Sequence, residues 1–179
     1  MGWKKLGSEE LHRGRFLSLR RDQVVRPDGS TGTYEHVSVH DTVRVVALDT
    51  RGRVLLVEDD FYLQGRRMLH LPGGSTDGQT AAVAGQRELA EETGLVAEHL
   101  EHLTTLDPMP GITAARLHLV VATGLTPVAN VVGRDATEIG MTAAWWPTSE
   151  AVAAVRAGRI TEAGSVAGLL LAVQRSSTS

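Results

Sequence analysis

Hydrophobic positions along the chain gather in short runs separated by polar turns. Two such runs, Thr42–Asp49 and Arg53–Glu58, surround a tight turn at Thr50-Arg51-Gly52. Their continuous apolar character predicts two buried strands that form a hairpin or an adjacent pair. Apolar and polar residues alternate over His99–Asp107 and Ala115–Thr123, which predicts two further strands.

The remaining segments complete a mixed pattern of strands and helices. Short strands with turns are predicted for Trp3–Val39, strands for Met68–Leu71 and Thr142–Trp146, and helices for Thr80–Thr93, Ser149–Ala157 and Glu162–Val173. Gly94 is placed to cap the first helix. Elements in this order predict an α/β fold whose sheet is covered on both faces. We expect residues 1–40 to add N-terminal strands to a main domain at 41–174, followed by a flexible polar tail at 175–179.

Composition narrows the class of protein. A chain of 179 residues with 42% hydrophobic and 22% charged residues is typical of one soluble globular domain. The absence of cysteine excludes disulfide scaffolds and cysteine-ligated zinc. A net charge of −3 without a basic run argues against nucleic-acid binding. No apolar run reaches membrane-spanning length and the N-terminus lacks the apolar core of a signal peptide, so no membrane partner and a cytoplasmic location are expected.

The segment from Pro72 to Leu95 carries the candidate chemistry. A Gly-rich turn leads into the helix that contains Glu88, Glu91 and Glu92. Residues three and four apart share one helix face, where each pair of like charges costs roughly 0.2–0.5 kcal/mol. A hard cation relieves this repulsion, and Mg²⁺ combines one or two carboxylates with water and substrate phosphates. The pattern therefore predicts a metal-dependent enzyme that acts on a phosphate-containing substrate.

This segment resembles the Nudix box of the Nudix hydrolases. That motif has Gly, five residues, Glu, seven residues, and then Arg-Glu-aliphatic-x-Glu-Glu-x-Gly-aliphatic. Gly73 and the block Arg87–Leu95 match it without gaps, and only Gln79 departs, because it stands where the motif has its first Glu. The resemblance implies an α/β/α sandwich with a mixed sheet, plus antiparallel strands at the N-terminus, and a pyrophosphohydrolase activity.

Replacement of the first motif Glu by Gln79 weakens a contact with Arg87. Its amide oxygen can still accept a hydrogen bond from Arg87, but the bond loses its charge assistance and about half its strength. We expect weaker bracing of the turn and weaker metal affinity with activity retained. A non-hydrolytic Nudix-fold protein that binds a ligand or regulates a partner is the alternative. An RNA-processing Nudix enzyme is disfavoured by the acidic net charge.

Segments outside the box resemble the ADP-ribose pyrophosphatase branch of the family. They are Val57–Gly74 before the box, the Pro-containing loop Asp107–Gly111, and Arg159–Ala172 in the closing helix. The resemblance implies a nucleoside diphosphate derivative as substrate, such as ADP-ribose or another nucleoside diphosphate sugar. It also implies a homodimer, because N-terminal strands in this branch are exchanged between subunits.

Some positions depart from that branch where it contacts its substrate. Phe61 replaces an Arg, His70 replaces a Glu, and Ala114-Ala115 replace an Asp-Glu pair. Phe lacks the bidentate phosphate grip of Arg. The diphosphate would then be held by the metal, by Arg66 or Arg67, or by the basic N-terminal region.

The resemblance implies a role for each candidate site residue. The metal ligands are Glu88, Glu92 and a carbonyl of the turn that we assign to Gly73, and Glu91 is a further ligand or a second acceptor. The general base is Glu138, with Asp135 as the alternative. Arg87 fixes the turn against the helix, and the residues that contact substrate are Arg66, Arg67 and Gly111. The implied cofactor is Mg²⁺, with Mn²⁺ as the alternative.

Overall fold

The computed structural model describes residues 2–128 and 140–176. Its strands are β1 (Lys4–Arg13), β2 (Ser18–Val25), β3 (Thr31–Ser38), β4 (Thr42–Ala47), β5 (Arg53–Phe61), β6 (Arg66–His70), β7 (Leu95–Leu106), β8 (Leu117–Pro127) and β9 (Thr142–Pro147). Its helices are α1 (Ala81–Thr93), α2 (Thr148–Arg156) and α3 (Ala163–Ser176). The three predicted helices are confirmed, and Gly94 caps α1 in a left-handed conformation with φ of 69°.

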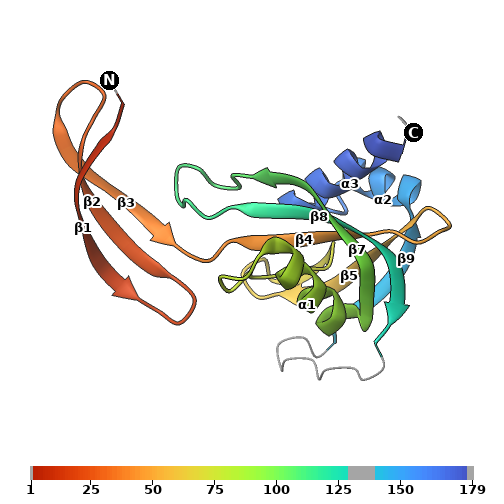
Figure 1. Cartoon of the computed structure of the whole chain (residues 1–179). Helices are drawn as coiled ribbons and strands as arrows, with labels where there is room; N and C mark the ends of the chain where they lie inside the picture. The colour runs from red at the N-terminus through yellow and green to blue at the C-terminus, as the bar shows by residue number, and fades with distance from the viewer. Residues whose placement is uncertain (1, 129–139, 177–179) are drawn as a thin grey trace.

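Two three-stranded sheets form the centre of the main body (Figure 1). In one sheet, β8 pairs in parallel with β4 and antiparallel with β7. In the other, β5 pairs antiparallel with β6 and β9. Helix α1 packs against one side of the body, and α2 and α3 pack against the other. The predicted α/β class and the sandwich with a mixed sheet are confirmed.

Side-chain alternation along the central strands divides the core between these two sides. On β4, Val43 and Val45 face the cluster under α1, whereas Val46 faces the cluster under α2 and α3. On β5, Leu55 joins the first cluster and Leu56 the second. Because successive strand residues point to opposite faces, a strand covered on both faces is apolar throughout. This explains the continuous hydrophobic runs in the sequence.

The predicted pairing of β4 with β5 is wrong. Their connection closes as a tight turn, in which Asp49 N donates to Arg53 O at 3.0 Å, and a single bridge joins Leu48 to Val54. The two strands then separate into different sheets. Sequence periodicity shows that both strands are buried, but it does not show which strand each one pairs with.

Several element boundaries also differ from prediction, among them those of β7, β8 and α3. Strand β7 begins at Leu95, directly after the cap of α1, and not at His99. Helix α3 continues to Ser176, so it includes the first two residues of the predicted 175–179 tail. No helix in the described part of the chain is long and apolar enough to span a membrane.

Strands β1, β2 and β3 form a separate antiparallel sheet, which we call the N-terminal sheet. It projects to one side of the body (Figure 1). The loop between β7 and β8 reaches it, because Val37 N donates to Ile112 O at 2.8 Å and the Tyr34 hydroxyl donates to Gly111 O at 2.9 Å. Val24 is the one buried residue among the described strands of this sheet. The N-terminal sheet therefore has almost no core of its own.

Candidate active site

The Gly-rich turn after β6 is held against the edge of β4 by backbone hydrogen bonds. Val43 N donates to Gly74 O at 2.9 Å, and Val45 N donates to Pro72 O at 2.8 Å. Gly73 lies between these bonds with φ of 142°, and a Cβ added there would overlap the carbonyl oxygen of Val43. Only glycine allows the turn to lie this close to the strand.

Helix α1 presents Glu88 and Glu92, four residues apart, to this turn. Their exposed fractions are only 7% and 5%. Glu92 Oε2 accepts a hydrogen bond from Gly73 N at 2.9 Å. A Cβ added to Gly74 would lie 2.6 Å from Glu88 Oε1, so the second glycine lets the turn approach this carboxylate. The turn and the helix thus bury two carboxylates side by side.

Arg87 ties the turn to the helix. Its guanidinium donates to Ser75 O at 2.7 Å, to Gln79 Oε1 at 3.3 Å and to Glu91 Oε2 at 3.0 Å, and it lies 2.9 Å from Glu88 Oε1. Burial lowers the pKa of Arg87, but the carboxylates of Glu88 and Glu91 outweigh burial and raise it above its usual value. Gln79 accepts the hydrogen bond expected of it, at a distance typical of a weak bond.

A cavity of about 390 Å³ lies beside these groups, and we call it the glutamate cavity. Its walls include Glu88 and Glu92 from α1, the Gly73-Gly74 turn, and side chains from β4, β5 and β6. Three of the four predicted metal-ligand residues therefore meet at one cavity. The fourth, Glu91, is absent from the walls and bonds Arg87.

The donors in this cavity fit a hard cation. Within residues 2–128 and 140–176, no group of three His, Asp or Glu side chains is positioned to hold a metal. Two carboxylates are nevertheless sufficient for Mg²⁺, which takes its other ligands from carbonyl oxygens, water and substrate phosphates. Glu88 and Glu92 supply the carboxylates, and the Gly73 carbonyl lies at the same cavity.

Arg44 on β4 is a site residue that the sequence analysis missed. It lines the glutamate cavity and donates to Gly73 O, while its Nε donates to Glu162 Oε2 at 3.2 Å. Burial raises the pKa of Glu162, but Arg44 and hydrogen bonds from Ser165 outweigh burial and hold it below its usual value. Arg44 could have been found in the sequence, since it is the one charged residue inside an otherwise apolar strand. A charged side chain in a buried strand rarely lacks a partner, so its position points to a specific contact.

His70 at the end of β6 also lines the cavity and is 3% exposed. Burial lowers its pKa, and the positive charge of Arg44 lowers it further. The His70 ring packs edge-on against Phe61, with 5.1 Å between ring centroids and 88° between ring planes. The two departures from the branch pattern on β5 and β6 are therefore neighbours in space.

Arg66 and Arg67 line a second cavity of about 460 Å³, whose walls include neither Glu88 nor Glu92. Arg66 donates to Thr161 Oγ1 at 2.9 Å. Arg67 bonds the carboxylates of Glu58 and Asp60, each at 3.3 Å. Asp60 also lines the glutamate cavity, so Arg67 contacts a wall residue of that cavity without lining it.

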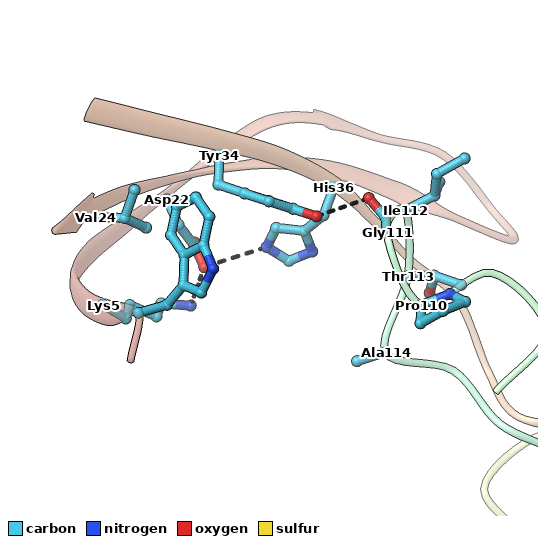
Figure 2. Close-up of a pocket in the computed structure, with 11 residues that line it drawn as sticks. Lys5, Asp22, Val24, Tyr34, His36, Pro110, Gly111, Ile112, Thr113 and Ala114 are labelled. Carbon is cyan, nitrogen blue, oxygen red and sulfur yellow. Dashed lines mark hydrogen bonds and ion pairs between the residues drawn. The ribbon is translucent and has the colours of Figure 1, made fainter. Parts of the chain in front are cut away.

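Gly111 lines a third cavity of about 470 Å³, between the N-terminal sheet and the loop that joins β7 to β8 (Figure 2). Trp3 and Tyr34 stand edge-to-face on one side, with ring centroids 5.6 Å apart. Asp22 lies 2.8 Å from Lys5 Nζ, and this contact is the largest cause that lowers the pKa of Asp22 to about 2. This cavity combines aromatic faces with a charged pair, away from the glutamates.

The predicted general base, Glu138, and its alternative, Asp135, lie outside the described residues. Their placement relative to the glutamate cavity stays a prediction.

Comparisons with known protein families identify two regions of the chain. Residues 3–37 match the nucleoside diphosphate sugar hydrolase N-terminal domain, and residues 38–164 match the NUDIX domain. A crystal structure described as an ADP compounds hydrolase superimposes with a TM-score of 0.84, covering 99% of this chain and 96% of the other at 20% sequence identity. That likeness supports the fold.

Curated relatives share more of the sequence. An ADP-ribose pyrophosphatase of Mycobacterium tuberculosis is 36% identical over 170 residues, 94% of this chain and 82% of the relative. A CMP-5'-(N-acetyl-N-hydroxy-3-aminopropyl)phosphonate hydrolase of Streptomyces rubellomurinus is 32% identical over 173 residues, 95% of this chain and 82% of the relative. Because the NUDIX match alone spans well over half of the chain, this protein belongs to the Nudix family.

Proposed function

We propose that this protein is a Nudix pyrophosphohydrolase that cleaves the diphosphate link of a nucleoside diphosphate derivative. The observation that carries the proposal is the pair of buried carboxylates, Glu88 and Glu92, beside a glycine turn at one cavity wall. Both relatives bear the names of hydrolases of compounds in which a nucleotide is joined to a second group. ADP-ribose and other nucleoside diphosphate sugars are the proposed substrate class.

Divalent cations serve Nudix hydrolases generally, and Mg²⁺ is the proposed cofactor here, with Mn²⁺ as the alternative. Glu88, Glu92 and the Gly73 carbonyl would hold it, with Glu91 as a further acceptor. When bound, the cation neutralises diphosphate charge and lowers the pKa of attacking water. Arg87 keeps the turn and the helix in register, so that the carboxylates stay directed at the cavity.

The remaining roles concern substrate and proton transfer. Glu138, or Asp135 in its place, would accept the proton of the attacking water. Arg66 and Arg67 would contact the substrate from the second cavity, and Gly111 would contact it from the loop under the N-terminal sheet. Phosphoryl transfer needs positioning and charge neutralisation more than covalent catalysis, so side chains at several walls can contribute.

The test is a panel of nucleoside diphosphate compounds incubated with the native chain. ADP-ribose, ADP-glucose, UDP-glucose and a CDP-alcohol are assayed with Mg²⁺, with Mn²⁺ and with EDTA, and the monophosphate products are measured. We expect turnover of at least one compound that depends on the cation. Tight binding of a compound without turnover of any would instead favour the non-hydrolytic alternative.

We further propose that the protein acts as a homodimer in the cytoplasm. The N-terminal sheet has one buried residue among its described strands, and its exposed large hydrophobic residues include Trp3, Leu6 and Tyr34. A second copy would cover such a surface and supply the apolar burial that the sheet lacks. Light scattering on the native chain should give twice the mass of one chain, and a Leu6→Ser variant should shift it toward the monomer.

A further inference from the structure

Two side chains of the glutamate cavity have binding capacity that no other described residue uses. They are Arg44 on β4 and His70 on β6, and both line the cavity with Glu88 and Glu92. The neighbouring Phe61 also lines the cavity, but its ring offers no hydrogen bond to a phosphate. The cavity therefore needs another group to contact a phosphate.

His70 offers a lone pair at a buried position. Its Nδ1 lies 2.9 Å from the carbonyl oxygen of Leu71. A carbonyl only accepts hydrogen bonds, so Nδ1 carries the proton and Nε2 is the acceptor. Nε2 is fully buried and has no hydrogen-bond partner among the described residues. A buried acceptor without a partner is costly, which points to a ligand group that donates to it.

Arg44 offers a cation beside that acceptor. Among the described residues that line the cavity, it is the only Arg or Lys. Its Nε donates to Glu162 and its Nη1 to the Gly73 carbonyl, whereas Nη2 has no partner among the described residues. Glu162 is itself fixed at the start of α3 by the backbone N–H groups of Gly164 and Ser165, at 3.0 and 2.7 Å. Arg44 is therefore held at the cavity wall with a donor to spare.

We propose that Arg44 and His70 form a subsite of the glutamate cavity for a phosphate group that carries a hydroxyl group nearby. An ionised phosphate accepts hydrogen bonds, so it pairs with the Arg44 guanidinium and not with the lone pair of His70. A hydroxyl donates, so it pairs with His70 Nε2. The ligand class is thus the phosphorylated sugar half of the substrate, and the inference rests on the proposed function because it concerns the same cavity.

Ligands that the proposed reaction does not consume test the subsite. Isothermal titration calorimetry in a Mg²⁺ buffer compares ribose 5-phosphate with methyl phosphate, which has the phosphate but no hydroxyl. We expect the native chain to bind ribose 5-phosphate about tenfold more tightly, the value of one hydrogen bond to a buried partner. Equal affinity for the two compounds would overturn the subsite, whatever the hydrolysis panel shows.

Variants assign the two contacts. His70→Phe keeps an aromatic ring beside Phe61 but removes the acceptor, so it should abolish the preference for ribose 5-phosphate and leave methyl phosphate binding unchanged. His70→Gln, which restores an acceptor oxygen, should recover part of the preference. A preference that survives in His70→Phe would exclude His70 as the hydroxyl partner.

Arg44→Gln should weaken the binding of both phosphates by at least tenfold, because a charge-assisted hydrogen bond is lost. Arg53→Gln, away from the cavity, is the matched control and should change neither affinity. Unchanged phosphate binding in Arg44→Gln would show that Arg44 only braces the turn. If Arg44→Gln fails to fold, Arg44→Lys replaces it in the test, because it retains the positive charge. Unchanged phosphate binding in Arg44→Lys would exclude a bidentate contact between Arg44 and the phosphate. Hydrolysis of the panel without any preference for ribose 5-phosphate would leave the proposed function standing and remove this inference alone.

Discussion

Charged side chains are paired at the surface of the N-terminal sheet but are buried around the glutamate cavity. In the sheet, Arg21 and Glu35 meet at 2.7 Å with side chains 39% and 53% exposed. At the cavity, Glu88 and Glu92 are 7% and 5% exposed and lie against the glycine turn. The same types of residue therefore stand in two very different environments.

The difference determines how much each contact contributes. Exposed ion pairs are worth about 0–1 kcal/mol, since water competes for both partners. A buried charge that loses its partner destabilises a protein by about 3–5 kcal/mol. Substitutions at the glutamate cavity should consequently have large effects, and matched substitutions in the N-terminal sheet small ones.

The largest contrast is expected in catalysis. Glu92→Gln removes a carboxylate charge at the cavity and should lower kcat by about 10³-fold, if about 4 kcal/mol of transition-state stabilisation is lost. Glu9→Gln removes the same charge from an exposed position on β1 and should leave kcat unchanged. Steady-state kinetics on the best compound of the panel measures both. A Glu92→Gln variant as active as the parent would show that the cavity is not the reaction site.

The next contrast concerns two glycines. Gly73→Ala places a Cβ onto the Val43 carbonyl at a φ that side chains rarely adopt, and should destabilise the fold by about 3 kcal/mol. Gly7→Ala on β1 meets nothing within 4 Å and should be neutral or stabilise by at most about 1 kcal/mol. Urea unfolding of both variants measures the difference, which would vanish if the turn could move away from β4.

The sequence revealed the elements of this site better than their connections. Glu88 and Glu92 share a helix face because of their spacing, and the glycine turn was recognised because its residues lie close together in the chain. The contact that holds Arg44 at this cavity joins it to Glu162, 118 positions away, and a local pattern does not contain it. The side-by-side placement of Glu88 and Glu92 was thus predictable, whereas the presence of Arg44 at the same cavity was not.

The same reasoning explains the error in strand pairing. A hydrophobic run at Thr42–Ala47 shows that a strand is buried on both faces, but it carries no information about the neighbouring strand. Strand β4 pairs in parallel with β8, which lies about 75 residues along the chain, as in the register of Thr42 with Leu117. Parallel partners are joined by long connections, so tertiary structure alone identifies them.

A smaller contrast is expected in how the stability of the two regions depends on pH. The pKa of Glu162 is lowered in the folded state. Its carboxylate therefore stabilises the protein at pH values above the ordinary pKa of 4.5, and this contribution is lost as the pH falls through the folded-state pKa. Glu162→Gln should therefore destabilise by about 2 kcal/mol at pH 7, with a difference from the parent that narrows below pH 4.5. Glu10→Gln in the N-terminal sheet removes a surface carboxylate that pairs with Arg13 and Arg20, and it should change stability less at either pH. Urea unfolding at pH 7 and pH 3.5 checks both variants, and a gap that stays constant with pH would contradict this assignment.

The smallest effect is expected where the two regions are most alike, at partly exposed arginine contacts. Gln79→Glu gives Arg87 a charged partner in place of the amide now 3.3 Å away, and should stabilise by about 0.5 kcal/mol. The gain stays small because Arg87 already contacts Glu88 and Glu91, and a further carboxylate repels both. Glu35→Gln makes the opposite change at Arg21 and should destabilise by a similar amount. If Gln79→Glu instead raises kcat by more than tenfold, the native glutamine limits catalysis, and the weaker brace at Arg87 has a functional consequence that its stability contribution does not disclose.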